Sequence, residues 1–167
     1  MAACGPKRQF ALDANLLFDL AAQVDAAHDF RETFLAKGYA LRLAPTAAQE
    51  LINYHLHGPA GKRALATTAL LNMHEWRITP FDLGGVGHDL AAIFAHRLIE
   101  RGLLPPEEWN DGLILAETAL AEIPILVTSD KHLLDMDDTV LRMELANADL
   151  FPVIPCLPKA LLRAVRR

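Results

Sequence analysis

Short apolar runs alternate along this chain with longer stretches in which apolar residues recur every three or four positions. The first pattern predicts buried strands, and the second predicts amphipathic helices. Five strands are predicted, at residues 9–13, 39–43, 76–79, 125–127 and 152–154. Helices are predicted at residues 15–28, 29–37, 60–74, 89–101, 105–122, 130–135 and 138–147, with two more opening at Pro45 and Pro158. Strands separated by helices indicate an α/β sandwich built on a parallel sheet.

Local signals mark several of the helix ends. Gly38 and Gly102 each follow a predicted helix, a position where glycine is common. Thr46 and Gln49 have the spacing of a capping box, which predicts that Thr46 caps the helix opening at Pro45. Residues 80–87 are predicted to form a loop.

Four carboxylates fall where a predicted strand ends or where a predicted helix begins. Asp13 closes the first strand, Asp130 follows the fourth, and Glu50 and Asp111 lie in early helical turns. In an open parallel sheet, the carboxyl ends of the strands line the crevice that binds ligands. Acids gathered there would repel one another unless a cation lay among them. Oxygen ligands select Mg²⁺ or Mn²⁺, so the pattern predicts a metal-dependent phosphodiesterase site.

Each acid also has a purely structural explanation. Asp13 and Asp130 stand where aspartate often caps a helix, and the helix dipole favours Glu50 in a first turn. Asp111 is harder to explain in this way because apolar residues follow it, and buried aspartate is rare unless it is paired or bound to metal. The four acids together favour the metal site.

Other polar residues near these acids are candidates to support them. The candidates are Asn15, Thr128, Ser129 and Thr118. Thr118 lies seven residues after Asp111 on the same helix face, whereas Glu117 lies about 120° away and is expected to face elsewhere. Asp135 is close enough in sequence to Asp130 to serve as a reserve ligand.

His55 and His57 are a possible metal-binding pair, but residues two apart on a helix point in different directions. We interpret both as histidines at a helix end. Metal-free ribonuclease chemistry would need one of them.

The length and composition fit one globular domain over residues 1–167. With 167 residues, of which 52% are hydrophobic and 22% charged, the chain can bury a core of normal size. No apolar run approaches the ~18 residues of a membrane span, and no signal-peptide stretch precedes the first strand. Cys4 and Cys156 are too few for a disulfide framework or a zinc site. A reducing cytoplasm is the expected location.

The net charge of −5 argues against a broad basic surface for nucleic acids. Two divalent ions among the four acids would leave a charge of roughly −1, so a polyanionic substrate would depend on local basic side chains. The candidates are Arg97, Arg101, Lys131, Lys159, Arg163, Arg166 and Arg167. Such a scattered set is more typical of a solvated surface.

Four blocks of the sequence, taken in order, resemble those of the PIN domain. They are Phe10-Ala-Leu-Asp13-Ala-Asn15, Pro45-Thr-Ala-Ala-Gln-Glu50-Leu, Asn110-Asp111-Gly-Leu-Ile-Leu-Ala and Ile125-Leu-Val-Thr-Ser-Asp130-Lys-His-Leu-Leu. The resemblance implies a three-layer α/β/α sandwich whose five parallel strands have the order 3-2-1-4-5. That order reverses between the strands ending in Asp13 and Asp130, which is where such sheets bind ligands.

The resemblance also implies an activity. PIN domains are metal-dependent ribonucleases, and many small bacterial examples are VapC-like toxins of toxin–antitoxin pairs. Carried over position by position, the catalytic and metal-binding acids would be Asp13, Glu50, Asp111 and Asp130. The expected reaction is cleavage of single-stranded RNA by a water activated by Mg²⁺ or Mn²⁺, leaving a 5′-phosphate. The expected partners are RNA, an antitoxin that fills the acidic pocket, and a second copy of the chain bound through residues 15–37.

The chain departs modestly from the family pattern. Ala14 stands where a hydroxyl residue is frequent, and Trp109 and Asn110 precede the third acid where small residues are usual. Neither change removes a ligand. A structure-directed DNA nuclease stays open as an alternative, as does a nucleic-acid-binding protein without catalysis. The presence of all four acids disfavours a silent protein, because a dead site has no reason to keep groups that repel one another.

Overall fold

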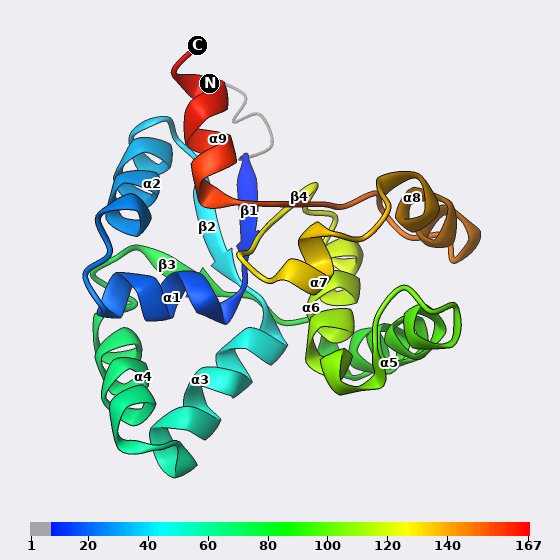
Figure 1. The fold of residues 1–167 in the computed structure, drawn as a ribbon, viewed down its shortest axis with the longest axis horizontal. Helices are drawn as coiled ribbons and strands as arrows, with labels where there is room; N and C mark the ends of the chain where they lie inside the picture. The colour runs from blue at the N-terminus through cyan, green and yellow to red at the C-terminus, as the bar shows by residue number, and fades with distance from the viewer. Residues whose placement is uncertain (1–7) are drawn as a thin grey trace.

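The computed structural model describes residues 8–167 and joins five parallel strands in one sheet of order β3-β2-β1-β4-β5 (Figure 1). The strands are β1 (Gln9–Leu12), β2 (Ala40–Leu43), β3 (Ile78–Pro80), β4 (Ile125–Val127) and β5 (Ile154–Cys156). The predicted fold class and strand order are therefore confirmed. Cys4 lies outside the described residues.

The central strand, β1, is buried on both faces. Phe10, Ala11 and Leu12 are each at most 1% exposed, as expected for a parallel strand covered by helices. Leu12 pairs with Leu43 of β2 on one side and with Val127 of β4 on the other. Both neighbours of β1 therefore end level with it, which brings the residues that follow them to one edge of the sheet.

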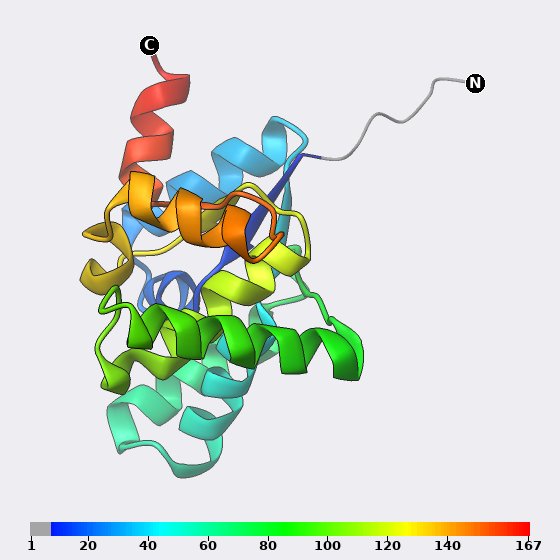
Figure 2. The same ribbon diagram turned by 90° about the vertical axis from the view of Figure 1, so that its right-hand side faces the viewer.

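Helices connect all the strands and surround the sheet (Figures 1 and 2). They are α1 (Ala14–Ala21), α2 (Asp25–Ala36), α3 (Pro45–His57), α4 (Ala60–Asn72), α5 (Gly84–Glu100), α6 (Trp109–Leu120), α7 (Lys131–Leu134), α8 (Asp138–Asn147) and α9 (Pro158–Val165), with a 3₁₀ turn at Pro106–Glu108. The pair α3 and α4 lies beyond the carboxyl ends of β1 and β2 (Figure 1). None of the helices within residues 8–167 is both long and apolar enough to cross a bilayer.

An aromatic cluster fixes α2 against the sheet. The ring of Phe10 stacks on Tyr39 with centroids 4.6 Å apart and meets Phe34 edge-on at 4.9 Å. Phe30 completes the cluster at 5.7 Å from Phe10. Each buried ring stabilises the fold by roughly 1.5–3 kcal/mol through removal of its surface from water.

The helices α5 and α6 lie side by side in both views (Figures 1 and 2). Gly112 of α6 makes this approach possible, because a Cβ there would lie 3.1 Å from the Cβ of Ala95. A hydrogen in place of a methyl group lets the two helices pack at short range. This packing positions the first turn of α6 at the edge of the sheet.

Several predicted boundaries are wrong. The helix predicted at residues 15–28 ends at Ala21, because Gln23 has φ 59°, a left-handed conformation that stops a helix; α2 then begins at Asp25 rather than residue 29. The helix α5 begins at Gly84, within the predicted loop. The last strand starts at Ile154, two residues later than predicted.

The predicted capping box at the start of α3 is also wrong. Ala44 occupies the N-cap and Pro45 the first helical position, so Thr46 already lies inside the helix. The backbone N–H and the hydroxyl of Thr46 both donate to Glu117 of α6, at 3.0 and 2.7 Å. A carboxylate 71 residues away in the sequence thus accepts a hydrogen bond from a backbone N–H in the first turn of α3 and links α3 to α6.

Candidate metal centre

Asp13 lies at the N-cap of α1, directly after β1. Its Oδ1 accepts from the N–H of Ala14 at 2.7 Å, and its Oδ2 accepts from the hydroxyl of Thr128 at 2.9 Å. The residue is 4% exposed, and this burial raises the pKa of its carboxyl to about 6 against the opposing effect of both hydrogen bonds. Asp13 therefore caps α1 and also faces the groups at the end of β4.

Asp130 comes to the same place from β4. Its backbone N–H donates to the Thr128 hydroxyl oxygen at 3.0 Å. Its Oδ1 accepts from the backbone N–H of His132, so Asp130 is the N-cap of α7. The single hydroxyl of Thr128 therefore contacts both acid residues, one through its proton and one through its oxygen. This contact joins the ends of β1 and β4 at the point where the strand order reverses.

Asp111 lies in the first turn of α6 and is 8% exposed. Its Oδ2 is buried without a hydrogen-bond partner among the described residues. Burial is the main cause of a strongly raised pKa for this carboxyl; the neighbouring Glu108 carboxyl and the charges of Asp13 and Asp130 raise it further. A buried carboxylate that meets other carboxyls instead of donors lacks a positively charged partner.

Glu50 faces the group from α3. Its Oε1 accepts from the side-chain amide of Asn110 at 3.0 Å. Burial and then the charge of Asp13 raise the pKa of its carboxyl to about 7, although the Asn110 bond and Lys62 lower it. Asn110 directly precedes Asp111, so the bond holds α3 beside the start of α6.

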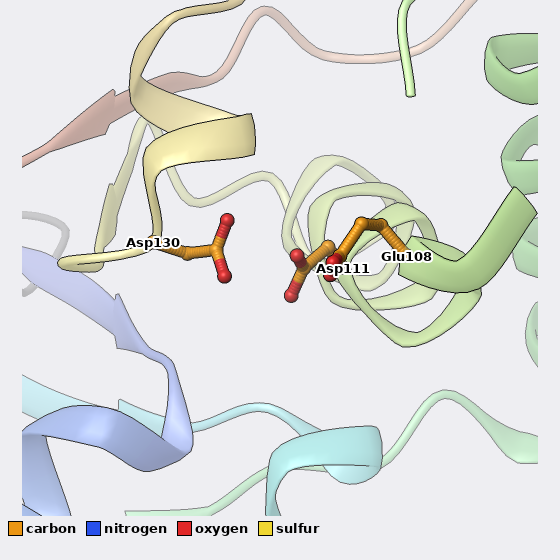
Figure 3. A group of neighbouring side chains, drawn as sticks. All are labelled: Glu108, Asp111 and Asp130. Atoms are coloured by element: carbon orange, nitrogen blue, oxygen red, sulfur yellow. The ribbon is translucent and has the colours of Figure 1, made fainter. Parts of the chain in front are cut away.

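Glu108 is a fifth acid at this site, and sequence reasoning missed it. Its carboxylate oxygen lies within 4.8 Å of oxygens from both Asp111 and Asp130, and the three side chains point toward one another (Figure 3). Its Oε1 lies 3.4 Å from Nε2 of His132. The signal in the sequence was its position three residues before Asp111, since such residues share one side of a helical turn.

The residues expected to support the acids fall into two groups. Thr128 contacts Asp13 and Asp130 as described, and Asn15 is half-buried in α1. Ser129 is exposed, and the buried hydroxyl of Thr118 donates to the Ile114 carbonyl at 2.7 Å rather than to Asp111. The structure therefore does not bring Thr118 into this hydrogen-bond network.

Several other side chains have different surroundings, and one of them, His57, lines a pocket with Glu50. Glu117 faces the start of α3, as its helical position predicted. His55 and His57 occupy the last turn of α3, where Nδ1 of His55 lies 2.7 Å from the hydroxyl oxygen of Thr67. Asp135 is an exposed residue at the C-cap of α7.

The donor set fits a hard divalent cation. The converging groups are carboxylates, which suit Mg²⁺ or Mn²⁺ better than the thiolate-binding metals. Oδ2 of Asp111 has no hydrogen-bond partner among the described residues, and burial, followed by the charges of neighbouring acids, raises the pKa values of Asp13 and Glu50. A cation at this site would stabilise the ionised form of each carboxyl.

Comparison with known proteins identifies the fold. No family model matches the sequence, and no curated protein matches it either. Solved structures do match: a chain of VapBC2 from Rickettsia felis bound to a DNA fragment from their promoter aligns with a TM-score of 0.61 and 16% identity, covering 89% of this chain and 98% of that one. The chain has a PIN-domain fold.

Two further structures share the PIN fold of this chain. A chain of VapBC-1 from nontypeable Haemophilus influenzae aligns with a TM-score of 0.55 and 12% identity, over 90% of this chain and 98% of that one. A chain of FitAcB from Neisseria gonorrhoeae aligns with a TM-score of 0.52 and 14% identity, over 89% of this chain and 97% of that one. The strand order reverses between the paired strands β1 and β4, and open parallel sheets bind ligands outside the carboxyl ends of the strands at such a reversal. Asp13 and Asp130 follow these two strands.

Proposed function

We propose that this protein is an endoribonuclease that cleaves single-stranded RNA with the help of Mg²⁺ or Mn²⁺. The observation that carries the proposal is the buried, partnerless Oδ2 of Asp111, which lies among other carboxylates at the switch point of the sheet. Asp13, Glu50, Asp111 and Asp130 would hold the cation. A bound cation of this kind lowers the pKa of a water molecule and stabilises negative charge on phosphate oxygens.

The protein's own contribution is to fix the carboxylates in place. Thr128 orients Asp13 through its proton and holds the backbone of Asp130 through its oxygen. Asn110 orients Glu50 by donating to Oε1. A carboxylate held in this way can receive the proton of an attacking water.

An open pocket beside Glu50 supports binding of a nucleotide. It has a volume of about 430 Å³ and is lined by Glu50, Asn53, Tyr54, His57 and Asn110 together with Gly58 and Pro59. Nearby, the Lys62 ammonium lies 4.8 Å from the centre of the Tyr54 ring. A cation and an aromatic ring beside the acidic cluster suit the phosphate and base of a single strand.

The distant basic residues contribute less to this proposal. Arg101 and Arg166 form ion pairs elsewhere. Nε of Arg101 lies 3.8 Å from Oε1 of Glu144, and Nη2 of Arg166 lies 2.6 Å from Oδ2 of Asp29. Lys131 is exposed at the first position of α7, directly after Asp130, so it is the nearest of the predicted candidates to the site. The substrate would therefore meet local positive charge from Lys62 and Lys131.

The partner proposed for this protein is an antitoxin. The matched structures are VapBC and FitAB toxin–antitoxin complexes, and one of them is bound to a DNA fragment from their promoter. A partner whose basic side chain entered the acidic pocket would compensate the same charges as a cation and would block RNA. A second copy of this chain is a further proposed partner, with residues 15–37 as the interface.

The decisive experiment is cleavage of a 5′-labelled single-stranded RNA by the full chain. Activity should require Mn²⁺ or Mg²⁺, stop in EDTA and yield 5′-phosphate products. Asp111→Asn should reduce the rate by about 100-fold or more, since the loss of a ligand weakens metal binding and shifts the metal-bound water. The matched control is Asp89→Asn, which removes an exposed carboxylate on α5 and should leave the rate unchanged.

Three outcomes would contradict the proposal. RNA cleavage that persists in EDTA and in the Asp111→Asn protein would exclude this chemistry. Products ending in a 2′,3′-cyclic phosphate would indicate metal-free chemistry. Preferential cutting of branched DNA over single-stranded RNA would instead favour a structure-directed DNA nuclease.

A further inference from the structure

We propose that Glu108 is a direct ligand of the bound cation, supplied from the 3₁₀ turn before α6. This inference rests on the proposed function, which assigns the cation to this pocket. It adds a fifth acid to the four recognised from the sequence. It also moves the expected position of the ion toward the start of α6, where Glu108, Asp111 and Asp130 converge.

Three carboxylate oxygens lie close together at the start of α6. Glu108, Asp111 and Asp130 each offer a carboxylate oxygen, and all three oxygens lie within 4.8 Å of one another. In an octahedral shell with bonds of about 2.1 Å, neighbouring oxygens lie about 3.0 Å apart and opposite ones about 4.2 Å apart. The three oxygens would therefore have to move closer by up to about 2 Å to surround one ion, a distance that side-chain rotation can supply.

Asp111 has a buried carboxylate oxygen without a hydrogen-bond donor. The residue is 8% exposed, and its Oδ2 has no hydrogen-bond partner among residues 8–167. Figure 3 shows its carboxyl beside that of Glu108 and facing that of Asp130. A buried carboxylate oxygen without a donor, directed at other acids, is the environment that a cation would satisfy.

The local structure explains why Glu108 reaches this position. The turn begins after Pro105 and contains Pro106, so two fixed φ angles restrict its backbone. Glu108 occupies the N-cap of α6, yet its side chain makes no capping hydrogen bond. Its carboxylate is therefore not used to start the helix, and its position three residues before Asp111 turns it toward the same side.

His132 holds Glu108 near the other ligands. Its Nε2 lies 3.4 Å from Oε1 of Glu108, while its backbone N–H donates to Oδ1 of Asp130 at 2.8 Å. One residue at the start of α7 therefore contacts two of the three proposed ligands. This arrangement keeps the Glu108 carboxylate at the mouth of the site instead of in solvent.

The oxygens of the other two acids have more hydrogen bonds. Both oxygens of Asp13 accept hydrogen bonds, and Oε1 of Glu50 accepts from Asn110. Each such oxygen keeps a further lone pair, so these acids still line the pocket. Of the acids at this site, only Asp111 has an oxygen that is buried without a hydrogen-bond partner among the described residues.

The test is Mn²⁺ binding to the full chain, measured without RNA by isothermal titration calorimetry and by the electron paramagnetic resonance signal of free Mn²⁺. Glu108→Gln should weaken Mn²⁺ binding by about 10- to 100-fold. Glu107→Gln is the matched control, because Glu107 is an exposed neighbour in the same turn, and it should bind like the wild type. Glu108→Asp should recover part of the loss.

The outcomes separate this inference from the proposed function. If Glu108→Gln binds Mn²⁺ within twofold of the wild type while Asp111→Asn loses binding, Glu108 is not a ligand and the proposed nuclease still stands. If the wild type binds no Mn²⁺ at millimolar concentration, the metal-dependent function itself is wrong. Thermal melts in EDTA check folding, and Glu108→Gln should melt no lower than the wild type, because removing one negative charge reduces repulsion.

Discussion

Replacement of Asp13 by asparagine should stabilise the metal-free protein in a strongly pH-dependent way. Burial raises the pKa of this carboxyl from 3.8 to about 6. A shift of about 2 units corresponds to about 3 kcal/mol, since one unit is worth about 1.4 kcal/mol. Asp13 is almost fully buried, so solvent screening does not reduce this value much. We expect a gain of about 3 kcal/mol near pH 7.5 and almost none near pH 4.

The sign follows from proton binding. Between about pH 4 and pH 6 the folded protein keeps the proton on Asp13 while the unfolded chain releases it, so wild-type stability falls as the pH rises through this window. Asparagine cannot ionise and avoids this loss. Its amide oxygen can still accept from Ala14, and asparagine is as good an N-cap as aspartate. The amide NH2 group replaces the oxygen that accepts from Thr128, so the Thr128 hydroxyl must turn and accept instead.

The assay is urea unfolding in EDTA at about pH 4, 6 and 7.5, followed by circular dichroism. The Asp89→Asn protein serves as the control, because that carboxylate is exposed on α5. Part of the gain acts through Glu50, whose pKa the Asp13 charge raises. A stability difference between Asp13→Asn and wild type that stays constant with pH, or that favours the wild type at pH 7.5, would refute this reasoning.

Three further predictions concern metal, packing and assembly. Mg²⁺ at about 100 times its dissociation constant should stabilise the wild type by about 2.7 kcal/mol, seen as a raised melting temperature, and the effect should shrink in Asp111→Asn; an unchanged melting temperature at millimolar Mg²⁺ would count against the site. Gly112→Ala should destabilise the fold by about 1–3 kcal/mol in urea unfolding, because the new methyl group would lie 3.1 Å from the Cβ of Ala95. This cost should exceed the gain from alanine's higher helix propensity. Equal or greater stability would show that α5 can move away. Light scattering at a protein concentration of tens of micromolar should show a dimer, and a strict monomer would contradict the proposed self-association.

The sequence predicted the parts of this structure that depend on local pattern and on strand order. Asp13 and Asp130 follow strands that end level with each other, so the topology alone brings them to one edge. Asp111 stood out because apolar residues follow it, and it is indeed buried. Periodicity correctly separated Glu117 from the Asp111 face.

The parts that the sequence did not predict depend on contacts between distant segments or on single backbone angles. The hydrogen bond between Thr46 and Glu117 joins residues 71 positions apart. A rule based on local sequence, such as the capping box, cannot predict a contact of this kind. The left-handed conformation of Gln23 has no signal in its residue type. Glu108 stood in the first turn of the helix predicted at residues 105–122, where the helix dipole already explains a glutamate, whereas in the structure α6 begins only at Trp109.

The double attachment of α3 to α6 has a mechanical consequence. Thr46 binds Glu117 near the start of α3, and Glu50 binds Asn110 one turn further along. Two bonds at different heights on the same pair of helices prevent α3 from pivoting, whereas a single bond would act as a hinge. Repulsion among the carboxylates therefore has to break both attachments before α3 and α6 can separate, so protonation of the side chains relieves it more readily than movement of the backbone. Ion loading should then change the backbone very little, so its speed would be set by loss of hydration water from the ion instead of by a conformational step.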